Sequence, residues 1–319
     1  MTDKEKYIRF CEQESLIPIY MRNWWLDCNC GPDKWNVLLY GKDGEIEAFM
    51  TYFQPYPGVV SMPMYSQSMG IWFNPAYDLE DTTKNIGRRH EICDFFIDHL
   101  PAHNHYLQRF PPSFTDWLPF YWKGYKQTTR YDYILPDISD VDKLWSELPE
   151  IRRSVNRAKN RYGLSVKRGI ALDDFFAIYD KTYKRQGIAT PEAGTLRKII
   201  EESQRRGLGD VWGAYDADNR LHAVLFVAWQ ESHAYAIASG RDPELPNSLA
   251  PTLLFWESIC FASTVSRSFD CEGSMLQGVE WFLRKFGGVQ TPYFTLYKGK
   301  RGLKDFFRIA TSKIRRMIR

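Results

Sequence analysis

The chain has no long hydrophobic run and no apolar leader at its beginning. Its longest apolar stretches, such as residues 223–229, fall far short of the ~18 to 20 residues needed to cross a bilayer. Residues 1–15 are charged throughout and lack the hydrophobic segment of a secretory signal. We therefore expect no transmembrane segment and a cytoplasmic location.

Motifs for metal binding and for nucleophilic catalysis are also missing. The 6 cysteines include one C-x-C, formed by Cys28 and Cys30, without a second pair at zinc-finger spacing. The sequence contains no G-x-S-x-G, H-E-x-x-H or G-x-x-x-x-G-K-[ST] pattern. These absences argue against a disulfide framework, a serine hydrolase, a zincin and a P-loop enzyme. We predict no metal ligand and no tightly bound cofactor.

An excess of charge of one sign is absent as well. Lys and Arg together number 42 and Asp and Glu 39, which gives a net charge of +3. This field is too weak to indicate general nucleic-acid binding, so any preference for anions must be local. The chain is instead rich in aromatic residues (16%, including 11 Trp and 19 Tyr), which are typical of clefts lined by flat, amphipathic rings.

A hairpin pattern occurs twice along the chain. Residues 35–53 form two β-rich arms around a turn at Lys42–Glu45, and residues 211–229 repeat this pattern. The two copies align Tyr40 with Tyr215, an offset of 175 residues. Such repetition predicts two similar α/β units.

The ends of the two copies also correspond. Residues 124–128 align with residues 287–291 at an offset of 163. A strand that ends at Leu135-Pro136, before Asp and Ser residues that start a helix, marks the boundary between the copies. We predict an α/β (α+β) fold of two tandem domains, each a mixed, largely antiparallel sheet flanked by helices. The predicted ranges are 1–135, 136–300 and a basic tail over 301–319.

Two acidic residues stand in the densest polar segment of the second half, residues 269–275. A buried strand would place Asp270 and Glu272 on one face only if that face met a cavity, a substrate or a partner. Arg284 and Lys285 follow shortly afterwards and supply positive charge. The segment is therefore either the edge of a cleft or a salt-bridged loop that packs on the core.

Basic residues surround a predicted helix that begins near Leu144 and continues through Ile151, Val155 and Ala158. This face is either solvated or a docking surface for an acidic or phosphorylated substrate.

A glycine motif at residues 204–209 matches Q-x-x-G-x-G, with which acyltransferases of the GNAT superfamily hold pyrophosphate on backbone amides. In that superfamily the motif follows the fourth strand and opens a helix, whereas here it precedes a hairpin. The corresponding position, after the predicted strand 234–239, lacks the glycine pair. We interpret residues 204–209 as a turn, which weakens the prediction of a coenzyme A site.

The sequence resembles the Fem family of peptidoglycan interpeptide-bridge aminoacyltransferases and the broader FemAB-like group of GNAT acyltransferases. In the second half the resemblance rests on residues 152–159, 182–187, 234–235, 250–251, 269–273 and 282–287. In the first half it rests on residues 24–27, 62–70 and 117–124. It implies two tandem GNAT-like domains, in agreement with the duplication.

The resemblance implies acyl transfer to an amine by direct attack on an activated ester or thioester, in a cleft between the domains. The implied donor is aminoacyl-tRNA or acyl-CoA. The implied acceptor is a small-molecule or lipid-linked cell-envelope precursor of the peptidoglycan type, with phosphate groups. One departure stands out: the lysine of the family pattern F-K-x-x-F-G is Leu283 here. Either Arg284 or Lys285 then supplies the charge, or the donor differs from aminoacyl-tRNA.

The candidate site follows from these patterns. Asp270 or Glu272 would accept the proton of the amine, or would be a structural or substrate-orienting carboxylate. Arg185 matches an arginine that the resemblance associates with acceptor binding. The predicted substrate-binding residues are Tyr65, Gln67, Gly70, Arg152, Arg157, Arg185, Tyr235, Arg241, Arg284 and Lys285. Two other functions stay open: a coenzyme A-dependent N-acyltransferase acting on a surface-sugar or lipid precursor, and a non-catalytic anion-binding module.

Residues 312–319 are basic and mildly amphipathic. They would touch anionic lipid on the inner face of the membrane, where a lipid-linked acceptor resides, or form a solvated helix. If they bind lipid, deletion of residues 312–319 lowers co-sedimentation of the protein with anionic vesicles. Equal partition of the full and shortened chains would contradict lipid contact.

Overall fold

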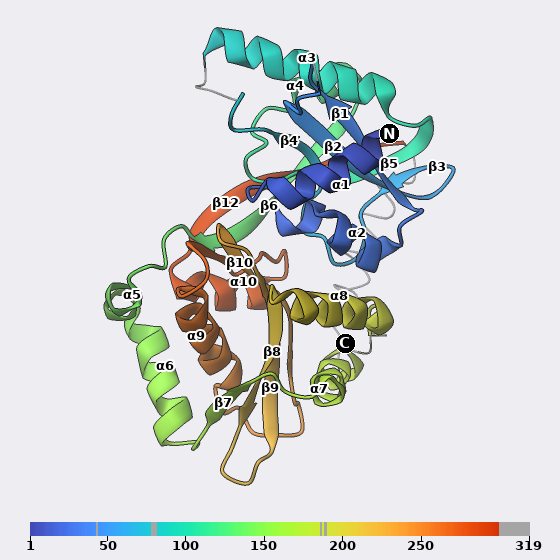
Figure 1. Ribbon diagram of the computed structural model, residues 1–319. Coiled ribbons are helices and arrows are strands. Elements are labelled where there is room, and N and C mark those ends of the chain that lie inside the picture. The colour runs from blue at the N-terminus through green and yellow to red at the C-terminus, as the bar shows by residue number, and fades with distance from the viewer. Residues whose placement is uncertain (43, 78–81, 186, 188–189, 300–319) are drawn as a thin grey trace. The chain divides into compact units, whose positions relative to one another are not determined.

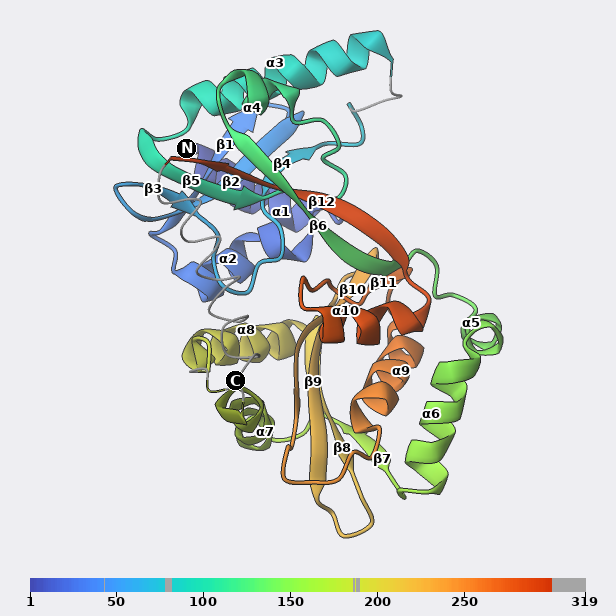
Figure 2. The ribbon, with the colours of Figure 1, turned by 180° about the vertical axis from the view of Figure 1, so that it is seen from behind.

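The computed structural model describes residues 1–42, 44–77, 82–185, 187 and 190–299 (Figures 1 and 2). Contacts divide the chain into unit 1, residues Met1–Arg130 with the described residues from Pro292 onward, and unit 2, Tyr131–Thr291. The predicted ranges 1–135 and 136–300 differ from these units because the last strand returns to unit 1. The predicted tail, 301–319, lies outside the described residues.

Unit 1 combines a sheet with helices. Its sheet has the order β1-β2-β3-β5-β12, and β4 pairs with β2. The elements in chain order are α1 (Asp3–Gln13), the 3₁₀ helix η1 (Ile19–Met21), α2 (Asn23–Cys30), β1 (Trp35–Tyr40), β2 (Ala48–Tyr56), β3 (Gly58–Ser61), β4 (Gly70–Phe73), α3 (Thr83–His99), β5 (His103–Arg109), α4 (Leu118–Trp122), the first part of β6 (Lys126–Leu135) and the second part of β12 (Val289–Lys298).

Both faces of the unit 1 sheet are covered, as the alternation of side chains along β2 illustrates. Met50 packs with Phe96 of α3 in one cluster, whereas Phe49 packs with Tyr7 of α1 in another. Successive side chains of a strand point to opposite faces, so α1 and α3 cover different faces. This two-sided burial explains why β2 is apolar at consecutive positions.

In unit 1 two short strands, β3 and β4, both pair with β2, and a segment outside the sheet separates them. β2 pairs with β4 over Ala48–Thr51 and with β3 at Phe53 and Tyr56. Residues 62–69, between β3 and β4, leave the sheet and pack against α2, where Trp25 Nε1 donates to the Tyr65 carbonyl at 3.0 Å. The chain itself therefore fills this part of unit 1.

Unit 2 has the sheet order β6-β11-β10-β9-β8-β7. Its elements are the second part of β6, α5 (Val141–Glu147), α6 (Pro149–Asn160), β7 (Ser165–Arg168), α7 (Leu172–Arg185), α8 (Ala193–Arg206), β8 (Gly209–Tyr215), β9 (Leu221–Trp229), β10 (His233–Arg241), α9 (Ala250–Ala262), β11 (Ser268–Asp270), α10 (Gln277–Leu283), the 3₁₀ helix η2 (Arg284–Phe286) and the first part of β12.

Helices also cover both faces of the unit 2 sheet. Leu225 of β9 lies in the apolar cluster that contains Val155 of α6 and Ile259 of α9. On the other face α7 contacts β9 and β10, and α8 contacts β8. The unit is thus a mixed, mainly antiparallel sheet between two helical layers, and it confirms the predicted fold class.

The predicted hairpins are confirmed as β1–β2 and β8–β9. The predicted turn at residues 204–209 is the end of α8, where Gly207 adopts a left-handed conformation with φ of 69°. The single helix expected from Leu144 is wrong, because α5 ends at Glu147 and Pro149 starts α6. No helix among the described residues is long and apolar enough to span a membrane.

The contact between β10 and α7 gives a testable prediction. A Cβ on Gly240 would lie 3.0 Å from Thr182 Oγ1, 3.1 Å from Tyr179 Cα and 3.2 Å from the Ile178 carbonyl oxygen. Because two of these atoms belong to the backbone, Gly240→Ala is expected to lower the free energy of unfolding by about 1 to 3 kcal/mol in urea titrations.

The matched control is Gly278→Ala in α10, where an added Cβ meets nothing within 4 Å. This variant is expected to be as stable as the parent or more stable by up to about 1 kcal/mol. Equal stability of the two variants would contradict the close packing of β10 on α7.

Candidate functional site

The parallel strands β10 and β11 pair over only three positions. His233, Ala234 and Tyr235 face Ser268, Phe269 and Asp270, where β11 ends. β10 continues to Arg241 and pairs with β9 alone, with an irregularity in register between Ala236 and Ala238. From residue 236 to 241 the other edge of β10 therefore has no strand partner in the described part of unit 2. Unpaired strand edges bind extended ligands through their backbone N–H and C=O groups.

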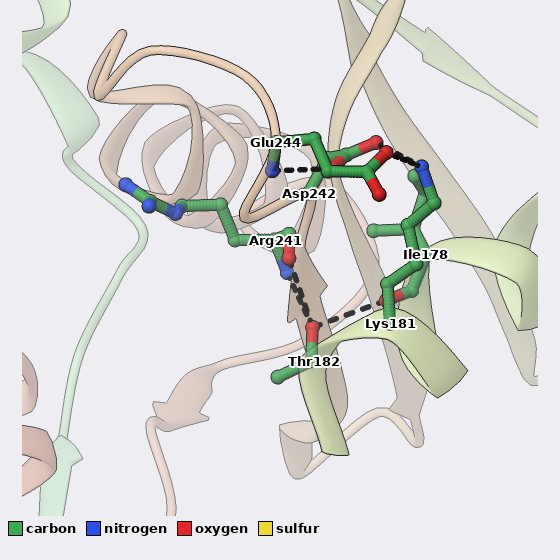
Figure 3. A network of polar contacts seen from close by, with 6 residues as sticks. All are labelled: Ile178, Lys181, Thr182, Arg241, Asp242 and Glu244. Atoms are coloured by element: carbon green, nitrogen blue, oxygen red, sulfur yellow. Dashed lines mark hydrogen bonds and ion pairs between the residues drawn. The ribbon is translucent and has the colours of Figure 1, made fainter. Parts of the chain in front are cut away.

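Helix α7 holds the far end of β10 (Figure 3). Thr182 Oγ1 accepts from the Arg241 N–H at 2.8 Å. Lys181 Nζ donates to Asp242 Oδ2 at 2.8 Å and to Glu244 Oε2 at 2.6 Å. The Glu244 N–H donates to Asp242 Oδ1 at 2.9 Å. These bonds fix the chain where it leaves β10 for the loop that precedes α9.

Helix α9 begins directly after this loop and offers an environment for anions. Its first turn contains a proline and has no hydrogen bond from a capping side chain. The free N–H groups of a helix N-terminus favour a negatively charged group. In Figure 3 the guanidinium of Arg241 points away from the Lys181 network. The free edge of β10 therefore runs toward an uncapped helix N-terminus and a cation.

Asp270 is a buried carboxyl group at the point where β10 and β11 part. It is 4% exposed, and its Oδ1 accepts from the Glu272 N–H at 2.7 Å. Burial raises the pKa of Asp270 to about 7, against the opposing effect of this hydrogen bond. A carboxyl group with this pKa exchanges its proton near neutral pH, as a general base must.

The prediction that Asp270 and Glu272 lie on one strand face is wrong. β11 ends at Asp270, and Glu272 has a left-handed backbone with φ of 59°. Glu272 instead contributes its N–H to Asp270. Gly273 follows in close contact with β6, since an added Cβ would lie 1.8 Å from the Tyr131 carbonyl oxygen. The two carboxylates therefore lie in different environments because of this tight turn. The spacing of the residues does not reveal the turn.

Other predicted residues of unit 2 lie on separate elements. Tyr235 is buried and is the register partner of Asp270, so these two are brought together. Arg241 stands at the opposite end of β10. Arg152 and Arg157 lie on α6, where Arg157 is exposed, and the exposed Arg185 ends α7.

Two further predicted cations follow α10 and have acidic neighbours. Arg284 Nε lies 3.6 Å from Glu280 Oε1, and Lys285 Nζ lies 3.5 Å from Glu150 Oε2. Lys285 also stands 3.4 Å from the centroid of a Trp281 ring. Arg284 and Lys285 therefore each have an acidic neighbour within unit 2.

Tyr65 and Gln67 lie in residues 62–69, which leave the unit 1 sheet, and Gly70 is the first residue of β4. Tyr65 and Gln67 are half-buried, and Gly70 is buried with φ of 97°. A Cβ on Gly70 would lie 2.8 Å from the ring of Phe110, so this glycine permits close packing. Their predicted role in substrate binding stays a prediction.

A pocket of about 340 Å³ lies between α7 and α8. Phe176, Ala177, Asp180, Thr190, Ala193, Gly194 and Arg197 line it. Its charged side chains are engaged, because Lys184 Nζ lies 2.5 Å from Asp180 and Arg197 Nη2 lies 2.6 Å from Asp173. Among the described residues there is no group of three or more His, Cys, Asp or Glu side chains suited to a metal ion.

Lys181 and Thr182 are the residues that sequence analysis missed. They stand 61 and 59 positions before their partners Asp242 and Arg241, so no local spacing connects them. The one available signal was the run of residues 182–187, which contributed to the family resemblance.

The raised pKa of Asp270 gives a prediction about stability. The native state binds a proton at Asp270 up to pH about 7, whereas an unfolded Asp releases it near 3.9. Stability contributed by this proton is therefore complete below pH about 4 and is lost as pH rises to about 7. Asp270→Asn, which mimics the protonated form, should be more stable than wild type at pH 8 by at least about 1 kcal/mol, the value of one pKa unit.

Urea titrations at pH 4 and pH 8 measure this difference, which should nearly vanish at pH 4. Asp142→Asn on the exposed face of α5 is the control for the loss of a carboxylate. A constant difference between Asp270→Asn and wild type at both pH values would contradict the raised pKa.

Comparisons with known proteins agree with this architecture. A family model described as an acetyltransferase (GNAT) domain matches residues 148–270. A search of curated protein sequences gave no significant match. The match covers the helices α6 to α9 and the strands β7 to β11.

Solved structures share the fold at low sequence identity. FemX has a TM-score of 0.67 at 12% identity, with 92% of this chain and 96% of that chain covered. The C-terminal domain of a protein named as a lysylphosphatidylglycerol synthetase from Agrobacterium fabrum has a TM-score of 0.58 at 12% identity, with 90% of each chain covered. A tandem GNAT protein from the clavulanic acid pathway has 0.52 at 10% identity, with 93% and 95% covered.

These likenesses concern the fold, since identity is 10 to 12%. The predicted resemblance is confirmed at that level: the chain has a FemAB-like fold of two tandem GNAT-like domains, and residues 148–270 match the model of a GNAT domain.

Proposed function

We propose that unit 2 is an N-acyltransferase that moves an acyl group from a thioester of coenzyme A to an amine. The proposal rests on one observation: the pairing of β10 with β11 ends at Tyr235 and Asp270. It places a free strand edge next to a buried carboxyl group whose pKa is about 7. The GNAT domain match over residues 148–270 supports the same class of reaction.

The free edge of β10 suits a donor that carries amides. The pantetheine arm of coenzyme A contains amide groups, and an extended amide chain adds to an unpaired strand edge through main-chain hydrogen bonds. The edge leads to α9, whose N-terminus has no side-chain cap and favours a phosphate group. Arg241 adds a guanidinium at the same end of β10.

The loop between β10 and α9 contains carboxylates that oppose a diphosphate. Lys181 contacts both Asp242 and Glu244 and reduces this repulsion. Pro243 and Pro246 have no N–H to donate, so the loop holds fewer phosphate donors than a glycine-rich loop. We therefore assign phosphate binding to the start of α9 and to Arg241.

The proposed reaction needs no nucleophilic side chain of the protein. The neutral amine attacks the thioester carbonyl carbon, the C–N bond forms and the C–S bond breaks. Asp270 accepts the proton lost by the amine, directly or through water, and this proton then converts the departing thiolate to the thiol. The pKa of Asp270, about 7, suits transfer in both directions near neutral pH.

An aminoacyl ester such as aminoacyl-tRNA is the second donor class. The fold likeness to the protein named as a lysylphosphatidylglycerol synthetase favours it, with a phosphate-bearing cell-envelope precursor of the peptidoglycan type as acceptor. Leu283 argues against an RNA donor, because it occupies the position of the family lysine and is 5% exposed among Phe255 and Phe286. We therefore favour the thioester.

Binding and turnover can be measured separately. We expect wild-type protein to bind acetyl-CoA or a longer acyl-CoA in calorimetry and to release free thiol when a reactive amine is added. Asp270→Asn should reduce kcat about 10²- to 10⁴-fold because the base is lost, while the Kd for acyl-CoA changes less than about twofold. Asp142→Asn should preserve both quantities.

Three results would contradict the proposal. Wild-type protein that binds no acyl-CoA would exclude the thioester donor, and aminoacyl-tRNA would then be tested in the same assay. Binding without turnover across a panel of amines would favour an anion-binding module. Full kcat in Asp270→Asn would exclude Asp270 as the base.

A further inference from the structure

One buried histidine holds both ends of the loop that leads into α9. His222, near the start of β9, is 5% exposed. Its carbonyl oxygen accepts from the Asp242 N–H at 2.9 Å. Its Nδ1 lies 2.9 Å from Ser248 Oγ, and Ser248 is 3% exposed. His222 thus ties the loop at its first residue and again just before the helix.

Asp216 fixes the orientation of the imidazole from the other side. His222 Nε2 lies 3.0 Å from Asp216 Oδ2. Burial opposes the charge of Asp216, but hydrogen bonds from His222 and Arg220 lower the pKa of this carboxyl group well below its ordinary value. The ionised carboxylate accepts a hydrogen bond from Nε2–H, so in the neutral imidazole Nδ1 accepts a hydrogen bond from the Ser248 hydroxyl.

Asp216 is itself held by the hairpin turn. Its Oδ1 accepts from the Asp218 N–H at 3.1 Å and from the Arg220 N–H at 2.9 Å. Arg220 Nε adds a bond of 2.8 Å to Oδ2. The turn between β8 and β9 therefore anchors a chain of contacts through His222 to Ser248, at the start of α9.

The residue after Ser248 has a strained backbone. Leu249 adopts the left-handed region with φ of 63° and immediately precedes Ala250, the first residue of α9. This conformation costs roughly 1 to 2 kcal/mol for a residue with a side chain and persists where neighbouring contacts impose it. The bond from Ser248 to His222 holds the residue directly before Leu249, and the Leu249 N–H lies 3.5 Å from Asn247 Oδ1.

We propose that His222 is a positioning residue that, through Ser248, fixes the start of α9 and with it the phosphate end of the donor site. This inference rests on the proposed acyl-CoA donor. The same three residue types form nucleophilic triads in hydrolases, but Ser248 is 3% exposed and is out of reach of an acyl group. The contacts therefore hold the loop, and the serine is not a nucleophile.

Two substitutions of His222 distinguish its contact with Ser248 from its contact with Asp216. His222→Asn places its amide near the former Nδ1 and retains the bond to Ser248, whereas His222→Gln reaches toward Asp216 and loses Ser248. Ser248→Ala removes the last contact with the smallest change in volume. Ser146→Ala is the control, because Ser146 is exposed and its hydroxyl donates to the Lys143 carbonyl within α5.

Hydrogen exchange of the amides in residues 242–252 and calorimetric Kd values for acetyl-CoA provide the two measurements. In Ser248→Ala and His222→Gln we expect exchange of these amides to accelerate at least about fivefold and Kd to rise about tenfold. His222→Asn should show smaller changes in both quantities, and Ser146→Ala none. Circular dichroism and Tm confirm that each variant is folded, and Ser248→Ala serves if the His222 variants are not.

The outcomes distinguish this inference from the proposed function. Unchanged exchange in Ser248→Ala would overturn the positioning role whether or not acyl-CoA binds. Faster exchange with unchanged Kd would overturn its link to the donor. Absence of acyl-CoA binding by wild-type protein would instead overturn the proposed donor and, with it, the phosphate end assigned to α9.

Discussion

The candidate site depends on the early end of β11. Had β11 continued beside β10, main-chain pairing would have used the backbone groups along residues 236–240, and no edge would remain for a ligand, since Thr182 already accepts from the Arg241 N–H. Because β11 ends at Asp270, the edge of β10 is free and a carboxyl group is buried at the point of separation. The long strand and the short strand therefore define both the binding surface and the base that we assign to it.

The two units differ in the strands that pair with the central hairpin. In unit 2 one continuous strand, β10, pairs with β9 up to Arg241. In unit 1 two short strands, β3 and β4, occupy the corresponding side of β2, and residues 62–69 separate them. Since that segment includes the fully buried Met69, the chain itself occupies this side of β2, whereas residues 236–241 of β10 have no second strand partner in the described part of unit 2. The donor is accordingly assigned to unit 2.

Much of the fold could be predicted from local pattern. The turns at Lys42–Glu45 and at residues 217–220 mark hairpins because turn residues and flanking β-rich arms are contiguous in sequence. The glycine motif at residues 204–209 is recognised as a turn because its position in the order of elements is wrong for phosphate binding. These inferences need only neighbouring residues and the sequence of elements.

The site required tertiary information. Period-two spacing suggested a shared face for Asp270 and Glu272. The left-handed backbone of Glu272 gives the two carboxylates different directions. The spacing of residues in a sequence does not reveal such a backbone conformation. The contact of His222 with Ser248 joins residues 26 positions apart, and that of Lys181 with Asp242 joins residues 61 positions apart. Such contacts arise from the packing of strands and helices, and no sequence motif predicts them.

We infer that the edge of β10 binds an acyl donor. The decisive experiment is a crystal structure of the protein grown with acetyl-CoA. We expect the pantetheine arm along residues 236–240 and the diphosphate at the start of α9. Coenzyme A bound elsewhere on the chain, or an edge of β10 that stays without ligand at saturating acetyl-CoA, would contradict it.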